Sequence, residues 1–179
     1  MVETNKAKKH RISENWFDKY IQYPGIDIGS SNDPVDEKFD LWDFALGNGD
    51  ATYMEGVKDR TYKTVYASHI IEHLYFPVEG IKNWFRILDE GGHLIILAPH
   101  RDLYEKRKRL PSRWNPDHKT FWLPEEYEPP CTFSLKHTVL QAIPDANIVS
   151  LNVLIEDWKS DSENAHSQGE YSIEIIVKK

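Results

Sequence analysis

The densest group of side chains that could do chemistry is His69-x-x-Glu72-His73. This spacing matches H-x-x-E-H, in which two histidines four apart on a helix bind zinc and the glutamate acts as a base. In the zinc peptidases that carry this motif, the motif lies on a long helix. Here a β-branched segment directly precedes the motif and Pro77 follows it closely, which leaves little room for one. We therefore assign no metal and interpret His73 as a histidine that hydrogen-bonds locally.

A second group of candidate catalytic side chains follows the apolar segment 94–99. His100 comes directly after it, and His118 lies further along. Histidine suits a general base because its pKa lies near working pH. We take both histidines as candidate bases, with Asp102 or Asp117 as a carboxylate that could orient one of them.

A third segment, Gly-Ile-Asp-Ile-Gly-Ser-Ser at 25–31, places glycine at the end of a short apolar run. Glycine at a strand end lets the backbone come close to a ligand. The segment lacks the three glycines of a dinucleotide-binding fingerprint. Taken alone, it is equally typical of a tight turn.

The periodicity of apolar residues predicts the elements that position these segments. The alternation of strands and helices predicts an α/β protein with a mostly parallel sheet, and the closing strand pair predicts an antiparallel last strand. Ligands of such sheets bind at the carboxyl ends of the strands, where the three segments lie. Strands are expected at 26–29, 64–68, 93–98, 147–158 and 170–177. One helix is expected after Ser13. A second is expected at 77–88, with Gly91-Gly92 as its stop, and a third at 134–143, with Ser134 as its cap.

Three consecutive segments resemble one known family. Ala-Ser-His-Ile-Ile-Glu-His-Leu at 67–74, the helix with Trp-Phe-Arg-Ile-Leu at 84–88, and Gly-Gly-His-Leu-Ile-Ile-Leu-Ala-Pro-His at 91–100 are similar to strand four, the next helix and strand five of class I S-adenosylmethionine-dependent methyltransferases, type 11 most closely. The glycine segment at 25–31 then stands at the first cofactor motif. The resemblance covers most of 25–100 and 134–179. It implies a Rossmann-like three-layer sandwich with an antiparallel C-terminal hairpin.

The resemblance also implies the cofactor, S-adenosylmethionine, and its contacts. It implies one group of residues at the methionine end, a second at the adenine and a third near the sulfonium. Asp27, Gly29 and Ser30 are implied at the methionine end, Asp50 and Ala51 at the adenine, and Ser68 and His69 near the sulfonium.

The ribose ligand is expected to be an acidic residue after the second strand, because one carboxylate can accept from both ribose hydroxyls. Asp36, Asp40 and Asp43 are the alternatives, and we favour Asp43. Only thirteen residues separate Gly29 from Asp43, so the helix that the family places after its glycine motif is expected to be reduced or missing.

The implied activity is methyl transfer to an oxygen or nitrogen of a small molecule, such as a sugar or sugar nucleotide. Because the glycine motif is thinned, a non-catalytic binding protein of the same fold is the alternative. Residues 101–130, with five prolines, fall outside the family's common core and are expected to form an irregular substrate lid. Six basic residues against two acidic ones between Arg101 and Arg113 favour an anionic group on the acceptor.

Composition sets the outer limits. The chain has 179 residues, which suits one domain. A net charge of -7 argues against a general nucleic-acid binder. The longest apolar run, 94–99, is far shorter than the roughly 20 residues of a membrane span. One cysteine excludes an intrachain disulfide framework and is typical of a reducing cytoplasm, where we expect the protein.

Overall fold

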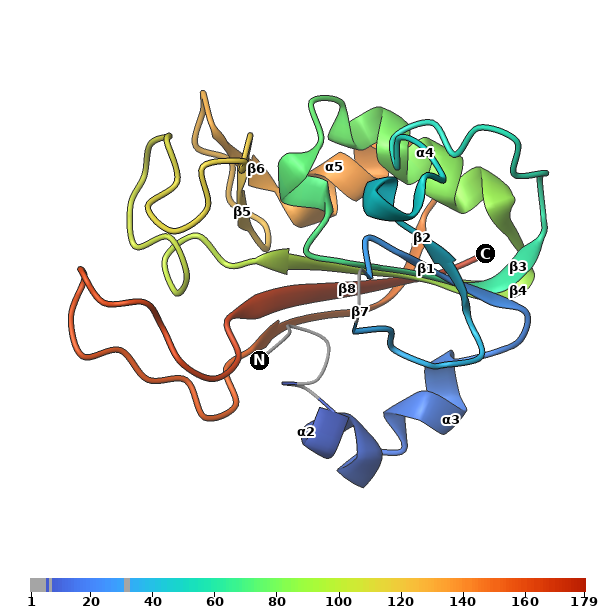
Figure 1. The fold of residues 1–179 in the computed structure, drawn as a ribbon, viewed down its shortest axis with the longest axis horizontal. Coiled ribbons are helices and arrows are strands. Elements are labelled where there is room, and N and C mark those ends of the chain that lie inside the picture. The colour runs from blue at the N-terminus through green and yellow to red at the C-terminus, as the bar shows by residue number, and fades with distance from the viewer. Residues whose placement is uncertain (1–5, 7, 31–32) are drawn as a thin grey trace.

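The computed structural model describes residues 6, 8–30 and 33–179, without the side chains of residues 8–10. A six-stranded sheet in the order β2-β1-β3-β4-β8-β7 forms its centre (Figure 1). The first four of these strands run parallel, and β8 is antiparallel to both β4 and β7. The predicted α/β class and antiparallel terminal hairpin are confirmed. The strands are β1 (Gly25–Ile28), β2 (Asp40–Trp42), β3 (Tyr62–Ser68), β4 (Leu88–Pro99), β7 (Asn147–Leu154) and β8 (Ser172–Lys178).

Helices cover both faces of the sheet, so the predicted three-layer sandwich is confirmed (Figure 1). The helix α4 (Pro77–Ile87) and the helix α5 (Leu135–Ala142) lie on one face. The short helices α2 (Lys8–Ser13) and α3 (Trp16–Tyr20) lie on the other. Each face packs its own cluster of buried apolar side chains against the sheet. None of the described helices is long and apolar enough to cross a bilayer.

Both helices of the first face follow their sequence signals. α4 begins at Pro77 and buries Ile81, Trp84 and Ile87 at helical spacing. Ser134 caps α5, because its hydroxyl accepts a hydrogen bond from the backbone N–H of His137. The residue Ser13, expected to cap the first helix, instead ends α2. Asn15, in left-handed backbone conformation, precedes α3.

The expected stop at Gly91-Gly92 is wrong, because the helix ends at Ile87 and β4 already begins at Leu88. Leu88 adopts extended backbone and pairs with Tyr62 of β3. Gly92 therefore lies inside a strand. A Cβ atom there would stand 2.5 Å from the carbonyl oxygen of Lys63, so glycine permits the close approach of β3 and β4.

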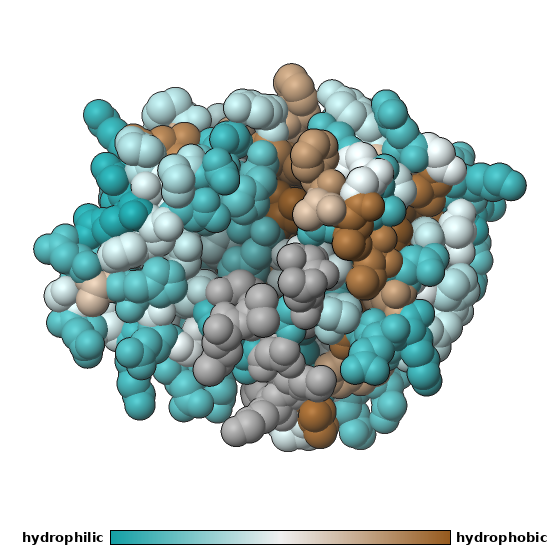
Figure 2. Space-filling model, in the orientation of Figure 1, coloured by the Kyte–Doolittle hydropathy of each residue, from teal (hydrophilic) through white to brown (hydrophobic). Residues whose placement is uncertain are grey.

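Residues 101–130 are irregular except for the strand β5 (Phe121–Leu123), which pairs in parallel with β6 (Thr132–Ser134). This segment lies beside the β7–β8 connection in Figure 1. Aromatic rings join the two, with Tyr104 and Trp114 packed against His166. The same side of the molecule is mostly hydrophilic in Figure 2. Ring packing thus helps to anchor this segment.

Candidate active site

A cavity of about 210 Å³ opens at the carboxyl ends of β1 and β2. It brings together four residues that the resemblance implied for cofactor binding, from three separate parts of the chain. Apolar side chains supply most of the remaining wall. The lining residues are Gly29, Trp42, Asp43, Phe44, Gly49, Asp50, Ala51, Ile70 and Leu74.

Gly29 brings the backbone of β1 to the wall of this cavity. Its φ of +79° lies in the left-handed region, and a Cβ atom would stand 2.9 Å from the Cβ atom of Ile70. Its N–H donates to the carbonyl of Trp42 at 2.7 Å, which ties β1 to the end of β2. Residue 30 and residues 33–39, the described part of the connection to β2, contain no helix, so the expected loss of that helix is confirmed there. Ser31, which closes the glycine motif, lies outside the described residues.

Asp43 directly follows β2 and lines the cavity. It precedes the 3₁₀ helix η1 (Phe44–Leu46), and its carboxylate accepts from the N–H of Ala45 at 2.8 Å. The carboxylates of Asp36 and Asp40 accept hydrogen bonds from the hydroxyls of Tyr23 and Tyr62. Neither lines the cavity. Of the three alternatives, only Asp43 therefore lines the cavity.

Asp50 and Ala51 form another part of the wall. One oxygen of the Asp50 carboxylate accepts from the N–H of Thr52 at 2.7 Å, which closes the turn that presents Ala51. The carbonyl of Ala51 accepts from the indole N–H of the buried Trp84 at 2.9 Å. The helix α4 therefore fixes the position of this loop.

Three further implied residues, Asp27, Ser30 and Ser68, lie outside the cavity wall but at the same edge of the sheet. All three are buried. The Oδ1 atom of Asp27 and the Oγ atoms of both serines have no hydrogen-bond partner within the described part of the chain. Burial raises the pKa of Asp27 to about 7, although the N–H of Val35 donates to its other oxygen. Polar atoms left in this way fit a polar ligand such as the methionine end of the cofactor.

A second cluster surrounds the fully buried carboxylate of Glu72. The Oε1 atom lies 3.7 Å from Nδ1 of His69, 4.0 Å from Nε2 of His73 and 3.8 Å from Nε2 of His118. His73 and Glu72 belong to the 3₁₀ helix η2 (Ile71–His73). The helix that the zinc-peptidase motif requires is thus reduced to three residues. Burial, followed by the neighbouring His118, lowers the pKa of His73.

Glu105 fixes His118 from the other side. Its Oε1 atom lies 2.6 Å from Nδ1 of His118, and its second oxygen accepts from the hydroxyl of Ser112. Both partners of the His118–Glu105 contact are almost completely buried. The expectation that Asp102 or Asp117 orients a histidine missed this carboxylate. Glu105 lies in the segment without a steady period, so no pattern of residues pointed to it.

The segment 70–74 separates the cavity from this cluster. Ile70 and Leu74 line the cavity, whereas Glu72 and His73 belong to the cluster. His69, implied as a contact of the sulfonium, is not in the cavity wall. Its Nε2 atom instead lies 2.9 Å from the hydroxyl of Ser172 on β8. The cluster therefore stands one short turn of chain away from the cavity.

The other candidate base, His100, lies at the end of β4 and is not part of the Glu72 cluster. Its Nδ1 atom accepts from the N–H of Asp102 at 3.2 Å, and burial lowers its pKa. The carboxylate of Asp102 pairs with Arg101 at 2.8 Å, so it orients an arginine rather than a histidine.

Several basic side chains between Arg101 and Arg113 form ion pairs or hydrogen bonds with other parts of the protein. Arg101 pairs with Glu128, as does Lys108. Lys106 and Arg113 donate to the β7–β8 connection. These contacts give the cations a role in anchoring segment 101–130.

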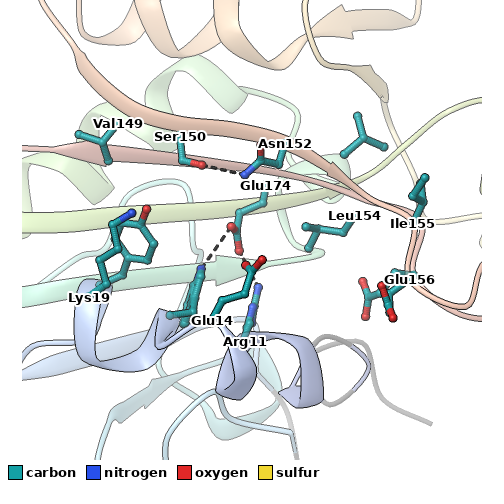
Figure 3. Close-up of a pocket in the computed structure, with 14 residues that line it drawn as sticks. Arg11, Glu14, Lys19, Val149, Ser150, Asn152, Leu154, Ile155, Glu156 and Glu174 are labelled. Carbon is teal, nitrogen blue, oxygen red and sulfur yellow. Dashed lines mark hydrogen bonds and ion pairs between the residues drawn. The ribbon is translucent and has the colours of Figure 1, made fainter.

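A different cavity of about 530 Å³ lies on the opposite face, between the N-terminal helices and β7 (Figure 3). Figure 3 shows Arg11 pointing toward Glu174 across this space. Their side chains form a buried ion pair at 2.8 Å. No residue of the sequence-based candidate site lines this cavity.

The fold is similar to that of several solved S-adenosylmethionine-dependent methyltransferases. One from Thermotoga maritima is 15% identical over all of both chains, with a TM-score of 0.56. One from Archaeoglobus fulgidus is 17% identical over 96% of this chain and 94% of that chain, with a TM-score of 0.54. One from Aquifex aeolicus is 12% identical over 99% and 98%, with a TM-score of 0.52. No protein-family model and no curated protein matches the sequence. These similarities show that the chain has the class I methyltransferase fold.

Proposed function

We propose that the protein transfers the methyl group of S-adenosylmethionine to an oxygen or nitrogen of a small molecule. The observation that carries this proposal is the cavity at the ends of β1 and β2. There Gly29, Asp43, Asp50 and Ala51 converge from three segments of a class I methyltransferase fold. Asp43 would bind the ribose hydroxyls and Asp50 the adenine amino group.

The chemistry requires alignment more than activation of the cofactor. A lone pair on the acceptor attacks the methyl carbon, the carbon–sulfur bond breaks with its electron pair moving to sulfur, and S-adenosylhomocysteine leaves. An acceptor hydroxyl also loses a proton. His100 and His118 are the proposed proton acceptors, and both stand outside the adenosine cavity. A small sugar or sugar nucleotide is the proposed acceptor.

Calorimetry with S-adenosylhomocysteine tests the proposal. We expect the wild-type protein to bind it, and Asp43→Asn to bind it at least about 10-fold more weakly, because charge-assisted hydrogen bonds to the ribose are lost. Asp36→Asn is the matched control, since Asp36 is also acidic and follows the same glycine motif but contacts Tyr23.

The control should retain wild-type affinity. Absence of binding by the wild-type protein at about millimolar ligand, a concentration at which even a weak specific site would respond, would overturn the assignment.

A further inference from the structure

The geometry points to a divalent transition-metal site formed by Glu72, His73 and His118, with Glu105 as the residue that positions His118. One ligand atom from each of the first three residues lies within 4.8 Å of the others. Two imidazoles and one carboxylate form a ligand set typical of Zn²⁺ and related ions, with coordination positions left open.

The distances suit an ion placed between the three side chains. Around a tetrahedral zinc ion, with bonds of about 2.0–2.1 Å to imidazole nitrogen or carboxylate oxygen, the ligand atoms lie about 3.3 Å from one another. The Glu72 Oε1 atom lies 3.8 Å from His118 Nε2 and 4.0 Å from His73 Nε2. Side-chain rotations that draw these atoms closer together would let all three contact one ion.

The contact between Glu105 and His118 supplies the second observation. A carboxylate accepts hydrogen bonds, so the Nδ1 atom of His118 carries the proton at 2.6 Å from Glu105. The Nε2 lone pair is then free to bind a metal and lies toward Glu72. In many metal sites a carboxylate accepts a hydrogen bond from the second ring nitrogen of a metal-binding histidine and so orients the ring. The hydroxyl of Ser112 in turn holds Glu105.

Burial and access also agree with a metal site. The Glu72 side chain is fully buried and that of His118 is 3% exposed, whereas that of His73 is 30% exposed. The buried pair provides a dry, rigid half of the site, and His73 provides the side open to solvent. An ion can therefore enter past His73.

The site has a use in the reaction, and this part rests on the proposed function. The residues Ile70 and Leu74 line the cofactor cavity, and Glu72 and His73 lie between them in sequence. An acceptor hydroxyl bound to the ion would lose its proton more readily and present its oxygen lone pair to the methyl carbon. The proton would pass to solvent, since the Nε2 atom of His118 would be used by the ion. The favoured acceptor is then an oxygen nucleophile that can coordinate a metal.

Metal titration of the tag-free protein after chelator treatment tests the site without any acceptor. We expect Zn²⁺ to bind once per chain with a dissociation constant of about 10 μM or tighter. His118→Ala and Glu72→Gln should lose at least about 100-fold in affinity, and Glu105→Gln about 10–100-fold. His137→Ala is the matched control, because this exposed histidine contacts Ser134 instead. It should bind Zn²⁺ like the wild type.

Several readouts keep the test decisive. If His118→Ala does not fold, the nearly isosteric Glu72→Gln carries the comparison, together with the rise in melting temperature that Zn²⁺ should give only the wild type and the control. Failure of the wild type to bind Zn²⁺ or Mn²⁺, or unchanged affinity in both ligand variants, would overturn the site. Binding of S-adenosylhomocysteine is measured on the same samples. If the protein binds metal but not S-adenosylhomocysteine, the result contradicts the proposed methyl transfer and supports the proposed metal site.

The open coordination position has its own test. Co²⁺ in the site should show visible absorption bands, and acetohydroxamate, a simple oxygen ligand, should shift them in the wild type. Unchanged bands at saturating acetohydroxamate would overturn the role assigned to the ion in binding the acceptor.

Discussion

At the scale of single residues, the most informative group is the carboxyl of Asp27. Burial raises its pKa to about 7 from an ordinary value of 3.8. The folded protein therefore keeps this proton to higher pH than the unfolded chain does. The free energy of unfolding consequently falls as the pH rises from about 4 to about 7, and the loss is complete above that range.

We expect Asp27→Asn to remove this loss of stability. The amide oxygen can still accept from the N–H of Val35, and the amide carries no charge to bury. The variant should melt on the order of 5 °C above the wild type at about pH 8, with little difference at about pH 4. Melting curves at both pH values check this. Asp18→Asn, at an exposed position, should show no such change. A wild type that melts at a higher temperature than Asp27→Asn at the higher pH would contradict this prediction.

At the scale of elements, the junction of β1 with the segment before η2 shapes the cavity at the ends of β1 and β2. Gly29 and Gly47 have nearly the same backbone angle, with φ of +79° and +80°. A Cβ atom at Gly29 would collide with Ile70, whereas one at Gly47 meets nothing within 4 Å. The two glycines therefore separate backbone strain from loss of space.

Gly29→Ala and Gly47→Ala should each lose about 1 kcal/mol of stability from the left-handed backbone. Only Gly29→Ala should also weaken S-adenosylhomocysteine binding, by at least about 10-fold, because its methyl group displaces Ile70 from the cavity wall. Denaturant unfolding and calorimetry on both variants measure the two effects. Equal loss of binding in both would show that strain, and not the collision, closes the cavity.

Helices and strands were predictable where apolar periodicity was strong. They were less predictable where contacts with other parts of the chain set their bounds. The apolar run 94–99 indicates a buried strand, and it lies inside β4. Of the residues that the resemblance implied, Gly29 directly follows β1, and Asp50 lies in the loop between η1 and β3. Glu105 was not predictable, because it reaches His118 only through the folding of a segment with no period. Likewise, Leu88 reads as the end of a helix until its pairing with Tyr62 is known.

At the scale of the whole molecule, one buried ion pair joins the N-terminal layer to the sheet. Arg11 of α2 donates to the carboxylate of Glu174 at 2.8 Å and to the hydroxyl of Tyr66 at 2.9 Å. The indole N–H of Trp16 donates to the other oxygen of the same carboxylate. These contacts cross from α2 and the start of α3 to β3 and β8.

Glu174→Leu should reduce the free energy of unfolding by about 3–5 kcal/mol, because it leaves the Arg11 charge buried and without its carboxylate. The double variant Arg11→Met with Glu174→Leu should recover most of that loss, since no charge then remains buried there. Urea unfolding of both proteins gives the comparison. Glu79→Leu, which breaks the exposed pair with Lys82, should change stability by less than about 1 kcal/mol. A double variant no more stable than Glu174→Leu would contradict this account.

The position of β8 between β4 and β7 has a consequence for synthesis of the protein. Because residues 172–178 pair with residues 93–99 of β4, a nascent chain that has not yet released them leaves this edge of the mostly apolar part of β4 unpaired. Such an edge readily pairs with other chains. The same holds for any product of premature termination before residue 172. Until those last strand residues emerge from the ribosome, the chain therefore depends on chaperones or on fast completion to escape aggregation.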